Sequence, residues 1–151
     1  MLHGKKIRKE AKKEGKIKVT SGATPHHALF NMEKENTYLK MNPPLRDEED
    51  RAFVFSSLLS GDIDWVESDH APHTKEDKEK GKCGIPGFKG TLLLLDALRE
   101  NGMSEENLER IFNTNAAHTF GIDISPLPLP TNTKEREEIA GSRYPFDPYA
   151  L

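Results

Sequence analysis

Only two stretches of this chain are suited to form buried strands, and this shortage constrains the fold more than any other feature. Residues 16–21 alternate lysine with Ile17 and Val19, and residues 63–67 form a second short apolar run. Long polar loops and helix-forming segments separate the two runs. The alternation of strand and helix predicts an α/β fold with parallel strands. A closed eight-stranded barrel typically needs about 250 residues, so a chain of 151 residues cannot supply one.

Helices are predicted before, between and after the two strands. Residues 5–14 favour helix, and a second helix over residues 47–60 begins with acidic residues, as the helix dipole prefers. A third helix is predicted over residues 91–100, and Ser104 is expected to cap a fourth. The apolar residues expected on one broad face of the second helix are Ala52, Phe53, Phe55, Leu58 and Leu59.

Composition indicates a globular protein with a heavily charged surface. Hydrophobic residues make up 34% of the chain and charged residues 31%. No window approaches the roughly 18 consecutive apolar residues needed to cross a bilayer, and no apolar segment follows the basic start. We therefore expect no membrane partner and no signal peptide. The one cysteine, Cys83, excludes an internal disulfide and predicts a cytoplasmic location.

Charge is unevenly distributed along the chain. Residues 1–18 carry eight Lys/Arg against two Glu, a local charge of +6. Because the whole chain has a net charge of −3, the remaining residues carry −9. A nucleic-acid-binding arm and a solvated amphipathic helix are both compatible with this start. The helix is favoured because no aromatic or arginine-rich pattern accompanies the lysines, so no nucleic-acid partner is expected.

Histidines and a carboxylate follow the two predicted strands. His26 and His27 come after the first strand, and Asp69, His70 and His73 come after the second. In parallel α/β proteins the loops after the carboxyl ends of strands build the active site. A carboxylate and two imidazoles within five residues can bind a metal or share acid–base work. The same spacing also fits a hydrogen-bonded turn, so spacing alone leaves both interpretations open.

Five sequence blocks lie in order along most of the chain. They are VTSGATPHH at residues 19–27, KMNPPLR at 40–46, SDHAPHTKEDK at 68–78, GIPGFKG at 84–90 and NTNAAHTFGI at 113–122. Together they resemble the C-terminal part of the dihydroorotases, zinc-dependent cyclic-amide hydrolases of the amidohydrolase superfamily. The DHAPHT and NPPLR blocks favour dihydroorotases over the related hydantoinases and allantoinases.

The resemblance implies an incomplete TIM-barrel-like fold. Residues 1–121 would form about the last two strand–helix units of a metal-dependent amidohydrolase barrel, and residues 122–151, with five of the ten prolines, an extended tail. Family members build their metal centre from an HxH pair on the first strand, a lysine or aspartate on the fourth, and histidines on the fifth and sixth. No HxH pair occurs here. The resemblance therefore implies a truncated portion that is inactive alone.

Carried over residue by residue, the resemblance gives Asp69 two roles, as a metal ligand and as the general acid/base. A metal-bound hydroxide would attack the ring amide carbonyl of dihydroorotate, and the carboxylate would pass its proton to the leaving nitrogen. Asn42 and His73 would hold the substrate, and the backbone around Cys83 and Gly84 would line its ring. Zinc is the implied cofactor of the complete enzyme, and we expect this chain alone not to retain it.

The other candidate residues receive no ligand role from the resemblance. His26 and His27 are interpreted as structural, because the family's zinc ligands do not fall in the TPHH block. His70 is interpreted as a packing residue beside the site. Arg46 either meets a substrate carboxylate or caps the helix that follows.

Three functions remain open from the sequence. The first is the C-terminal portion of a dihydroorotase of pyrimidine biosynthesis, which interconverts dihydroorotate and N-carbamoyl-aspartate and is completed by the missing N-terminal barrel portion or by a homo-oligomer. The second is a non-catalytic dihydroorotase-like subunit that scaffolds a partner such as aspartate carbamoyltransferase. The third is an independent small metal-binding α/β protein that uses Asp69 and the nearby histidines.

Overall fold

The computed structural model of the chain describes residues 10, 19–34, 36–123, 125, 128–131 and 133–150. Apart from Glu10, the helix predicted over residues 5–14 lies outside the described residues, as do residues 16–18 of the strand predicted over 16–21. The basic segment at the start of the chain therefore remains an expectation from sequence.

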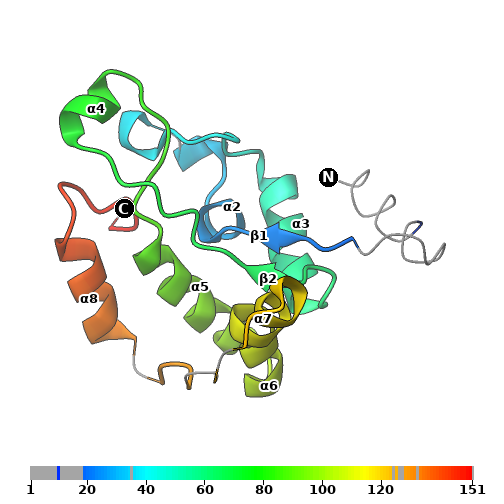
Figure 1. Cartoon of the computed structure of the whole chain (residues 1–151). Coiled ribbons are helices and arrows are strands. Elements are labelled where there is room, and N and C mark those ends of the chain that lie inside the picture. Colours follow the sequence, from blue (N-terminus) through cyan, green and yellow to red (C-terminus); the bar gives the residue numbers. More distant parts are fainter. Residues whose placement is uncertain are drawn as a thin grey trace.

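Two short parallel strands lie beside a mostly helical body (Figure 1). Strand β1, Gly22–Ala23, pairs with β2, Trp65–Val66, with Gly22 opposite Trp65. The Ser21 carbonyl accepts the Asp64 amide at 2.9 Å, and the Ala23 carbonyl accepts the Glu67 amide at 3.0 Å. The parallel α/β arrangement is confirmed for these residues. The second strand falls within its predicted range, whereas the first begins just after the predicted stretch.

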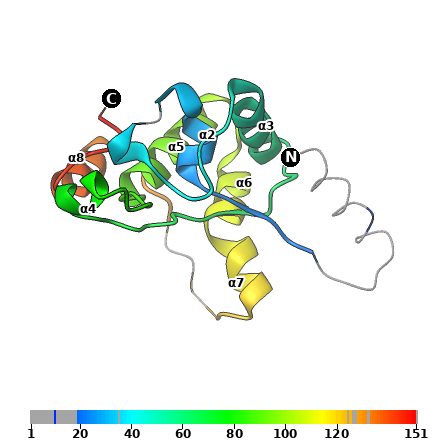
Figure 2. The ribbon, with the colours of Figure 1, turned by 90° about the horizontal axis from the view of Figure 1, so that it is seen from above.

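Three helices enclose the main core next to the strands. They are α2, Pro25–Leu29, α3, Glu48–Leu59, and α5, Phe88–Glu100, and α2 packs against both of the others. Figure 2 shows α2 lying between α3 and α5 when the molecule is viewed from above. Residues of these helices, of β1 and of segment 103–111 form one apolar cluster: Ala23, Ala28, Val54, Leu58, Leu94, Leu95, Leu98, Met103, Leu108 and Ile111.

Helix α3 follows its predicted bounds closely. The Asp47 side chain caps it by accepting the Asp50 amide at 2.9 Å, so Asp47, and not Arg46, is the cap. The predicted apolar face is partly wrong, because Val54, Ser57 and Leu58 are the buried residues and Ala52 is exposed. These three residues are spaced by three and one positions, which places them on a single narrow stripe of the helix. The two phenylalanines beside the stripe are only half-buried.

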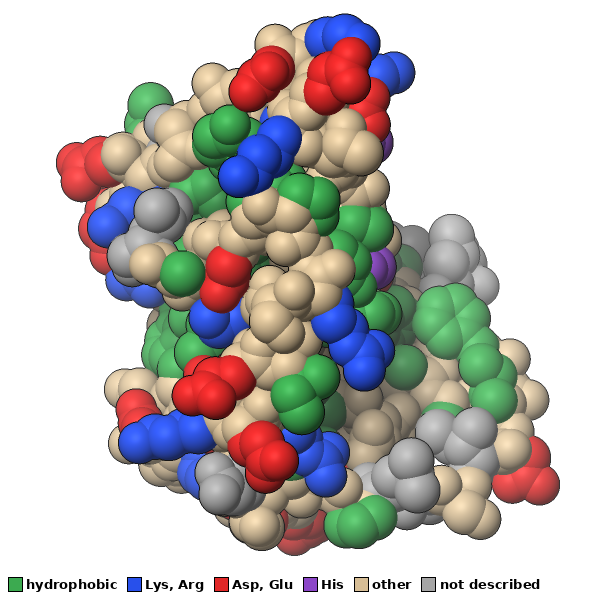
Figure 3. Space-filling model, turned by 90° about the vertical axis from the view of Figure 1, so that its left-hand side faces the viewer, with side chains coloured by type: hydrophobic (Ala, Val, Ile, Leu, Met, Phe, Trp, Pro, Cys, Tyr) green, Lys and Arg blue, Asp and Glu red, His purple; other side chains and the backbone are tan. Residues whose placement is uncertain are grey.

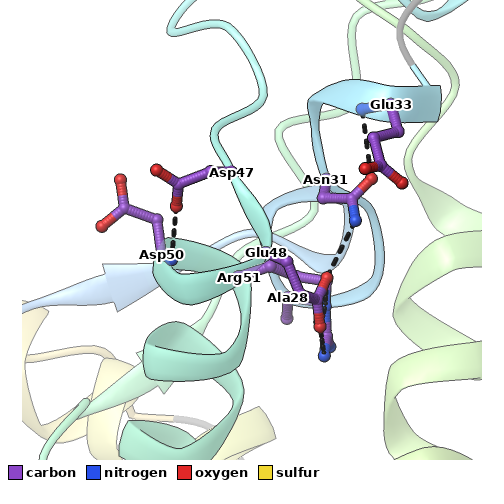
Figure 4. Close-up of polar contacts among 7 residues, drawn as sticks. All are labelled: Ala28, Asn31, Glu33, Asp47, Glu48, Asp50 and Arg51. Carbon is purple, nitrogen blue, oxygen red and sulfur yellow. Dashed lines mark hydrogen bonds and ion pairs between the residues drawn. The ribbon is translucent and has the colours of Figure 1, made fainter.

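One guanidinium group joins the end of α2 to the start of α3 (Figure 4). Arg51 donates to the Ala28 carbonyl at 3.2 Å and forms an ion pair with Glu48, whose Oε2 lies 2.7 Å from the Arg51 Nε. Asn31 donates a further hydrogen bond to Glu48 at 2.9 Å. The bonds from Arg51 and then Asn31 lower the pKa of Glu48 to about 2. The network fixes the two ends of the loop that carries Asn42.

The segment after α5 is a nearly continuous helix in three parts. Ser104 caps α6, Glu105–Glu109, as predicted, by accepting the Asn107 amide at 3.3 Å. A π-helical turn, η3, Arg110–Thr114, and then α7, Asn115–Phe120, continue it. The Asn115 side chain donates to the Asp64 carbonyl at 2.7 Å. This bond anchors α7 beside β2.

The C-terminal tail is not extended throughout, which corrects the prediction from its prolines. Helix α8, Lys134–Ser142, packs along α5 (Figure 1). Its sequence holds no proline, because all five tail prolines lie before or after it, so the helix is free to form. An ion pair between Lys89 and Asp147 holds the end of the tail against α5. Figure 3 shows acidic and basic side chains interspersed over this side of the molecule.

A second, smaller core joins short elements that the sequence did not predict. Two 3-10 turns, η1, Met32–Lys34, and η2, Thr37–Leu39, lead into the loop before α3, and α4, Lys75–Glu79, follows the loop that carries Asp69. The core beneath them comprises Leu39, Met41, Leu45, Ile85 and Tyr149. No helix in the described part of the chain is long and apolar enough to cross a membrane.

Candidate functional site

A cavity of about 830 Å³ opens beside β1 and reaches the loop that follows β2. Asn42 and Asp69, both predicted site residues, line it together with Arg46 and His27. Apolar residues of α3 and of the segment before β2 form another part of its lining. A cavity with an apolar wall and a few convergent polar groups is the usual form of a small-molecule site. The structure therefore brings Asn42 and Asp69 to one cavity.

Asp69 has an unusual backbone conformation. Its φ is +44°, in the left-handed region that few residues other than glycine adopt, although aspartate tolerates it better than most. The Asp69 side chain is 52% exposed, so its carboxylate reaches solvent at the cavity. Strained backbone positions cluster at functional sites because the surrounding structure must hold them. Asp69 is thus the residue of this loop with the clearest structural signature.

The glycine-rich segment predicted to line the substrate packs directly against the loop that carries Asp69. The Ala71 amide donates to the Ile85 carbonyl at 3.0 Å, and His70 forms an isolated parallel bridge with Ile85. Gly84 has a φ of +124°, and a Cβ at this position would lie 2.7 Å from the Ala71 carbonyl oxygen. Only glycine fits both requirements. The two loops therefore form one unit.

The remaining predicted substrate residues form a separate group. His73 bonds through Nε2 to the Cys83 carbonyl at 2.9 Å, and its Nδ1 lies 4.0 Å from the Asp77 carboxylate. Gly84 follows Cys83 in the chain, and a Cβ added to Gly84 would lie 3.2 Å from the His73 ring. His73, Cys83 and Gly84 are thus close to one another but do not line the cavity of Asn42 and Asp69. Their substrate-binding roles remain predictions.

His70 packs beside the site, as expected. Its ring stacks on Phe88 with centroids 3.8 Å apart, and its Nδ1 accepts the Gly87 amide at 3.1 Å. Because Nδ1 is an acceptor, Nε2 carries the proton and donates to the Tyr144 hydroxyl at 2.9 Å. Burial lowers the pKa of His70, which favours this neutral form. Both nitrogens are occupied within the fold.

The two histidines of the TPHH block differ sharply. His27 is tied down, with Nδ1 2.7 Å from the Thr24 hydroxyl and Nε2 3.1 Å from the Pro43 carbonyl. His26 is 1% exposed, and neither ring nitrogen has a hydrogen-bond partner in the described part of the chain. Its Nε2 lies 3.8 Å from Asp69 Oδ2. Burial, followed by the neighbouring His27, lowers the pKa of His26 to about 3, so this contact is no ion pair at neutral pH.

The described residues do not by themselves fit a zinc ion. Each catalytic zinc takes about three protein ligands, and no group of three or more His, Cys, Asp or Glu that could hold a metal occurs among residues 19–34, 36–123 and the described parts of the tail. His70 and His73 have other partners and do not converge on Asp69. The interpretation as an independent metal protein built on Asp69 and these histidines therefore lacks a ligand set. Asp69 can contribute one ligand.

Three residues near the site were missed from sequence. Lys78 is fully buried, and its ammonium donates to the Lys40 and Gly84 carbonyls at 2.6 and 2.9 Å, while burial lowers its pKa. The pattern of Thr74 followed three residues later by Asp77 could have revealed the helix that carries Lys78. Tyr144 and Tyr149 also reach the site, and no local signal marks a contact between residues so far apart in sequence.

Comparison with known proteins supports the sequence resemblance. No protein-family model matches the chain. A dihydroorotase of Bacillus cereus (strain B4264) is 37% identical over 131 residues, which cover 81% of this chain and 30% of that relative. A dihydroorotase of Bacillus thuringiensis (strain Al Hakam) has the same identity and coverage. The resemblance to the C-terminal portion of dihydroorotases is confirmed, and the chain spans 30% of the length of these relatives.

Solved structures show the same relation at the level of the fold. The D-hydantoinase (dihydropyrimidinase) of Thermus sp. matches with a TM-score of 0.69 and 26% identity, covering 78% of this chain and 29% of that protein. The dihydropyrimidinase of Brevibacillus agri NCHU1002 matches with a TM-score of 0.70 over 85% of this chain and 31% of its own, at 22% identity. The described α/β fold is therefore that of a part of these amidohydrolases.

Proposed function

We propose that this chain, which is similar to dihydroorotases over 81% of its length, is the C-terminal portion of a zinc-dependent cyclic-amide hydrolase of that type. It would interconvert dihydroorotate and N-carbamoyl-aspartate when the rest of the barrel is present. The observation that carries the proposal is that Asn42 and Asp69, which come after the carboxyl ends of β1 and β2, line one cavity. Ligands of open α/β sheets bind at this end of the strands.

The proposal assigns β1 and β2 to the seventh and eighth strands of a TIM-like barrel. Their parallel pairing and their following helices support this assignment. Residues of β1 line the cavity, and in a closed barrel a sixth strand would pair with β1 at the edge opposite β2. The missing strands would therefore convert an open cavity into an enclosed site.

Three polar residues of the cavity have tasks that suit their chemistry. The Asp69 carboxylate accepts the proton of the attacking water and returns it to the ring nitrogen as the amide bond breaks. The Asn42 amide donates hydrogen bonds to the substrate, and the exposed Arg46 offers a guanidinium that can pair with a substrate carboxylate. A zinc ion, when bound, would make the attacking water more acidic. The ligands beyond Asp69 would come from the missing part of the barrel.

Hydrolysis assays test the function directly. We expect no turnover of dihydroorotate by the isolated chain, and turnover after mixing with a polypeptide that carries the first six strand–helix units. Asp69→Asn should abolish that turnover, since an amide cannot accept the proton, whereas Asp123→Asn, at an exposed position outside the cavity, should not. Robust turnover by the isolated chain, or full activity of the Asp69→Asn mixture, would refute the proposal.

A second candidate is a non-catalytic dihydroorotase-like subunit. The absence of a third metal-binding side chain near Asp69 among the described residues favours it. In that case the chain would bind a partner, such as aspartate carbamoyltransferase or a complete dihydroorotase, without conferring turnover. A stable complex with no activity in the mixing experiment would select this function. In either case we expect a cytoplasmic protein, because its one cysteine is exposed and unpaired.

A further inference from the structure

The imidazole of His26 is buried without a hydrogen-bond partner in the described part of the chain. An imidazole ring carries at least one N–H donor, and its neutral form also has one lone pair. Burying such a group without a partner costs about 1–3 kcal/mol. His26 is 1% exposed, yet neither of its nitrogens is paired in the described part of the chain. A group this well buried needs a partner close by.

The nearest carboxylate identifies that partner. Asp69 Oδ2 lies 3.8 Å from His26 Nε2, which is longer than a hydrogen bond and too short to admit a bridging water molecule. His26 is buried in α2, whereas the Asp69 side chain is half-exposed. A movement of the carboxylate by about 1 Å would bring the two atoms to bonding distance, near 2.8 Å.

We propose that His26 is a positioning residue for Asp69. Its Nε2–H donates a hydrogen bond to Oδ2 and holds the carboxylate in the left-handed loop, so that Oδ1 is presented to the cavity shared with Asn42. The catalytic consequence rests on the proposed function, because only then does one defined oxygen of Asp69 need to face a substrate. The hydrogen bond itself does not depend on it.

The surroundings of His26 support this direction of bonding. His27, the other histidine of the block, is bound to Thr24 and Pro43 and is not available to Asp69. The one other buried and unpaired group beside Asp69 in the described part of the chain is the Tyr149 hydroxyl. Burial raises the pKa of Tyr149, with Asp147 and Asp69 adding to the effect, so the phenol stays protonated. Two buried donors of the fold thus lie near one carboxylate.

Nuclear magnetic resonance of the full chain tests the hydrogen bond without any enzymatic assay. Long-range proton–nitrogen correlations distinguish the two tautomers of each histidine. We expect His26 in the Nε2–H form, with a slowly exchanging Nε2–H proton. Asp69→Asn should shift this resonance and speed its exchange about tenfold, the factor that corresponds to 1.4 kcal/mol. The exposed His118 serves as the internal control and should not respond.

Other results of the resonance experiment would contradict the proposed hydrogen bond. An Nδ1–H tautomer, a rapidly exchanging Nε2–H proton, or a His26 signal that ignores Asp69→Asn would overturn the proposal. If the Nε2–H signal responds to Tyr149→Phe and not to Asp69→Asn, His26 bonds to Tyr149 of the tail and not to Asp69. This result would also contradict the proposal. If the Asp69→Asn variant does not fold, Asp69→Glu is used instead and should move the same resonance.

Assays of turnover in the mixture with the upstream barrel units test the catalytic consequence. His26→Gln keeps an N–H donor near the place of Nε2 and should retain most of the turnover, whereas His26→Leu should lower kcat with little change in KM. Equal losses in both variants would indicate a role in packing only and contradict positioning. If the mixture shows no turnover at all, the proposed function fails, while the resonance experiment still decides whether His26 holds Asp69.

Discussion

Tyr149 and Gly90 show how a single side chain can join the tail to the site. Ring atoms of Tyr149 occupy the space in which a Cβ at Gly90 would sit, in the first turn of α5. The ring also stacks on Phe30 with centroids 5.2 Å apart. Glycine in a helix costs about 1 kcal/mol relative to alanine. At this position the cost is offset by the contact that glycine permits.

Replacing Gly90 by alanine should therefore destabilise the chain, against the normal helix preference. Overpacking of this kind costs about 1–3 kcal/mol, so we expect a net loss of about 1 kcal/mol in the free energy of unfolding, measured by chemical denaturation. The control is the same change in a Tyr149→Leu background, where the ring is gone. There Gly90→Ala should stabilise the chain, and a loss in both backgrounds would contradict the assigned contact.

Acid stability should depend on Glu48, whose pKa in the folded chain is about 2 because Arg51 and Asn31 donate to it. A carboxylate with a lowered pKa contributes stability above its unfolded pKa near 4.5 and loses it as pH falls towards 2. The difference in unfolding free energy between the chain and Glu48→Gln should therefore be largest above pH 4.5 and shrink below it. Glu49→Gln, an exposed change in the same helical turn, is the control. A difference that stays constant from pH 6 to pH 3 would contradict this account.

Individual site residues were predictable where the signal is local. Asp69 follows a predicted strand and lies within a sequence block that resembles a known family. Its place at the cavity was therefore predictable from the sequence. The unpaired state of His26 and its approach to Asp69 depend on how α2 packs between α3 and α5, which no local pattern encodes. For the same reason the fully buried Lys78 was missed, since lysines are usually exposed.

At the scale of elements, helix ends were the most predictable features. Ser104 caps α6 as predicted, and α3 begins within one residue of its predicted start, although Asp47 and not Arg46 caps it. The strands were less predictable, because pairing between β1 and β2 is set by contacts such as the Ser21 amide with the Asp64 carboxylate, at 2.8 Å. Helix α8 was missed because the prolines around it dominated the composition of the tail.

The cap of α3 supplies a prediction at this scale. Asp47→Ala removes the acceptor of the Asp50 amide and should lower the free energy of unfolding by about 1 kcal/mol. Asp47→Asn or Asp47→Ser should restore most of the loss, since both side chains can cap a helix. Thermal or chemical denaturation of the three variants checks this. If Asp47→Ser is as unstable as Asp47→Ala, the cap is not the source of the loss.

At the scale of the whole molecule, the helices bury part of their apolar surface against one another. Leu94 and Leu95 of α5 and Leu58 of α3 are buried in the main core. Apolar surface nevertheless remains, in the open cavity beside β1 and on exposed side chains outside it. The large exposed ones are Met32, Phe88, Phe120, Ile122 and Ile139. Exposed apolar surface of this kind favours association, because its burial contributes about 25 cal/mol per Å².

Sedimentation equilibrium of the purified chain over a range of concentrations tests most directly whether these 151 residues form an incomplete unit. We predict an average mass above the 17.0 kDa of one chain that rises with concentration, and a 1:1 complex once the upstream barrel units are added. A mass of 17.0 kDa at every concentration, with a cooperative thermal transition and no binding to those units, would contradict the account.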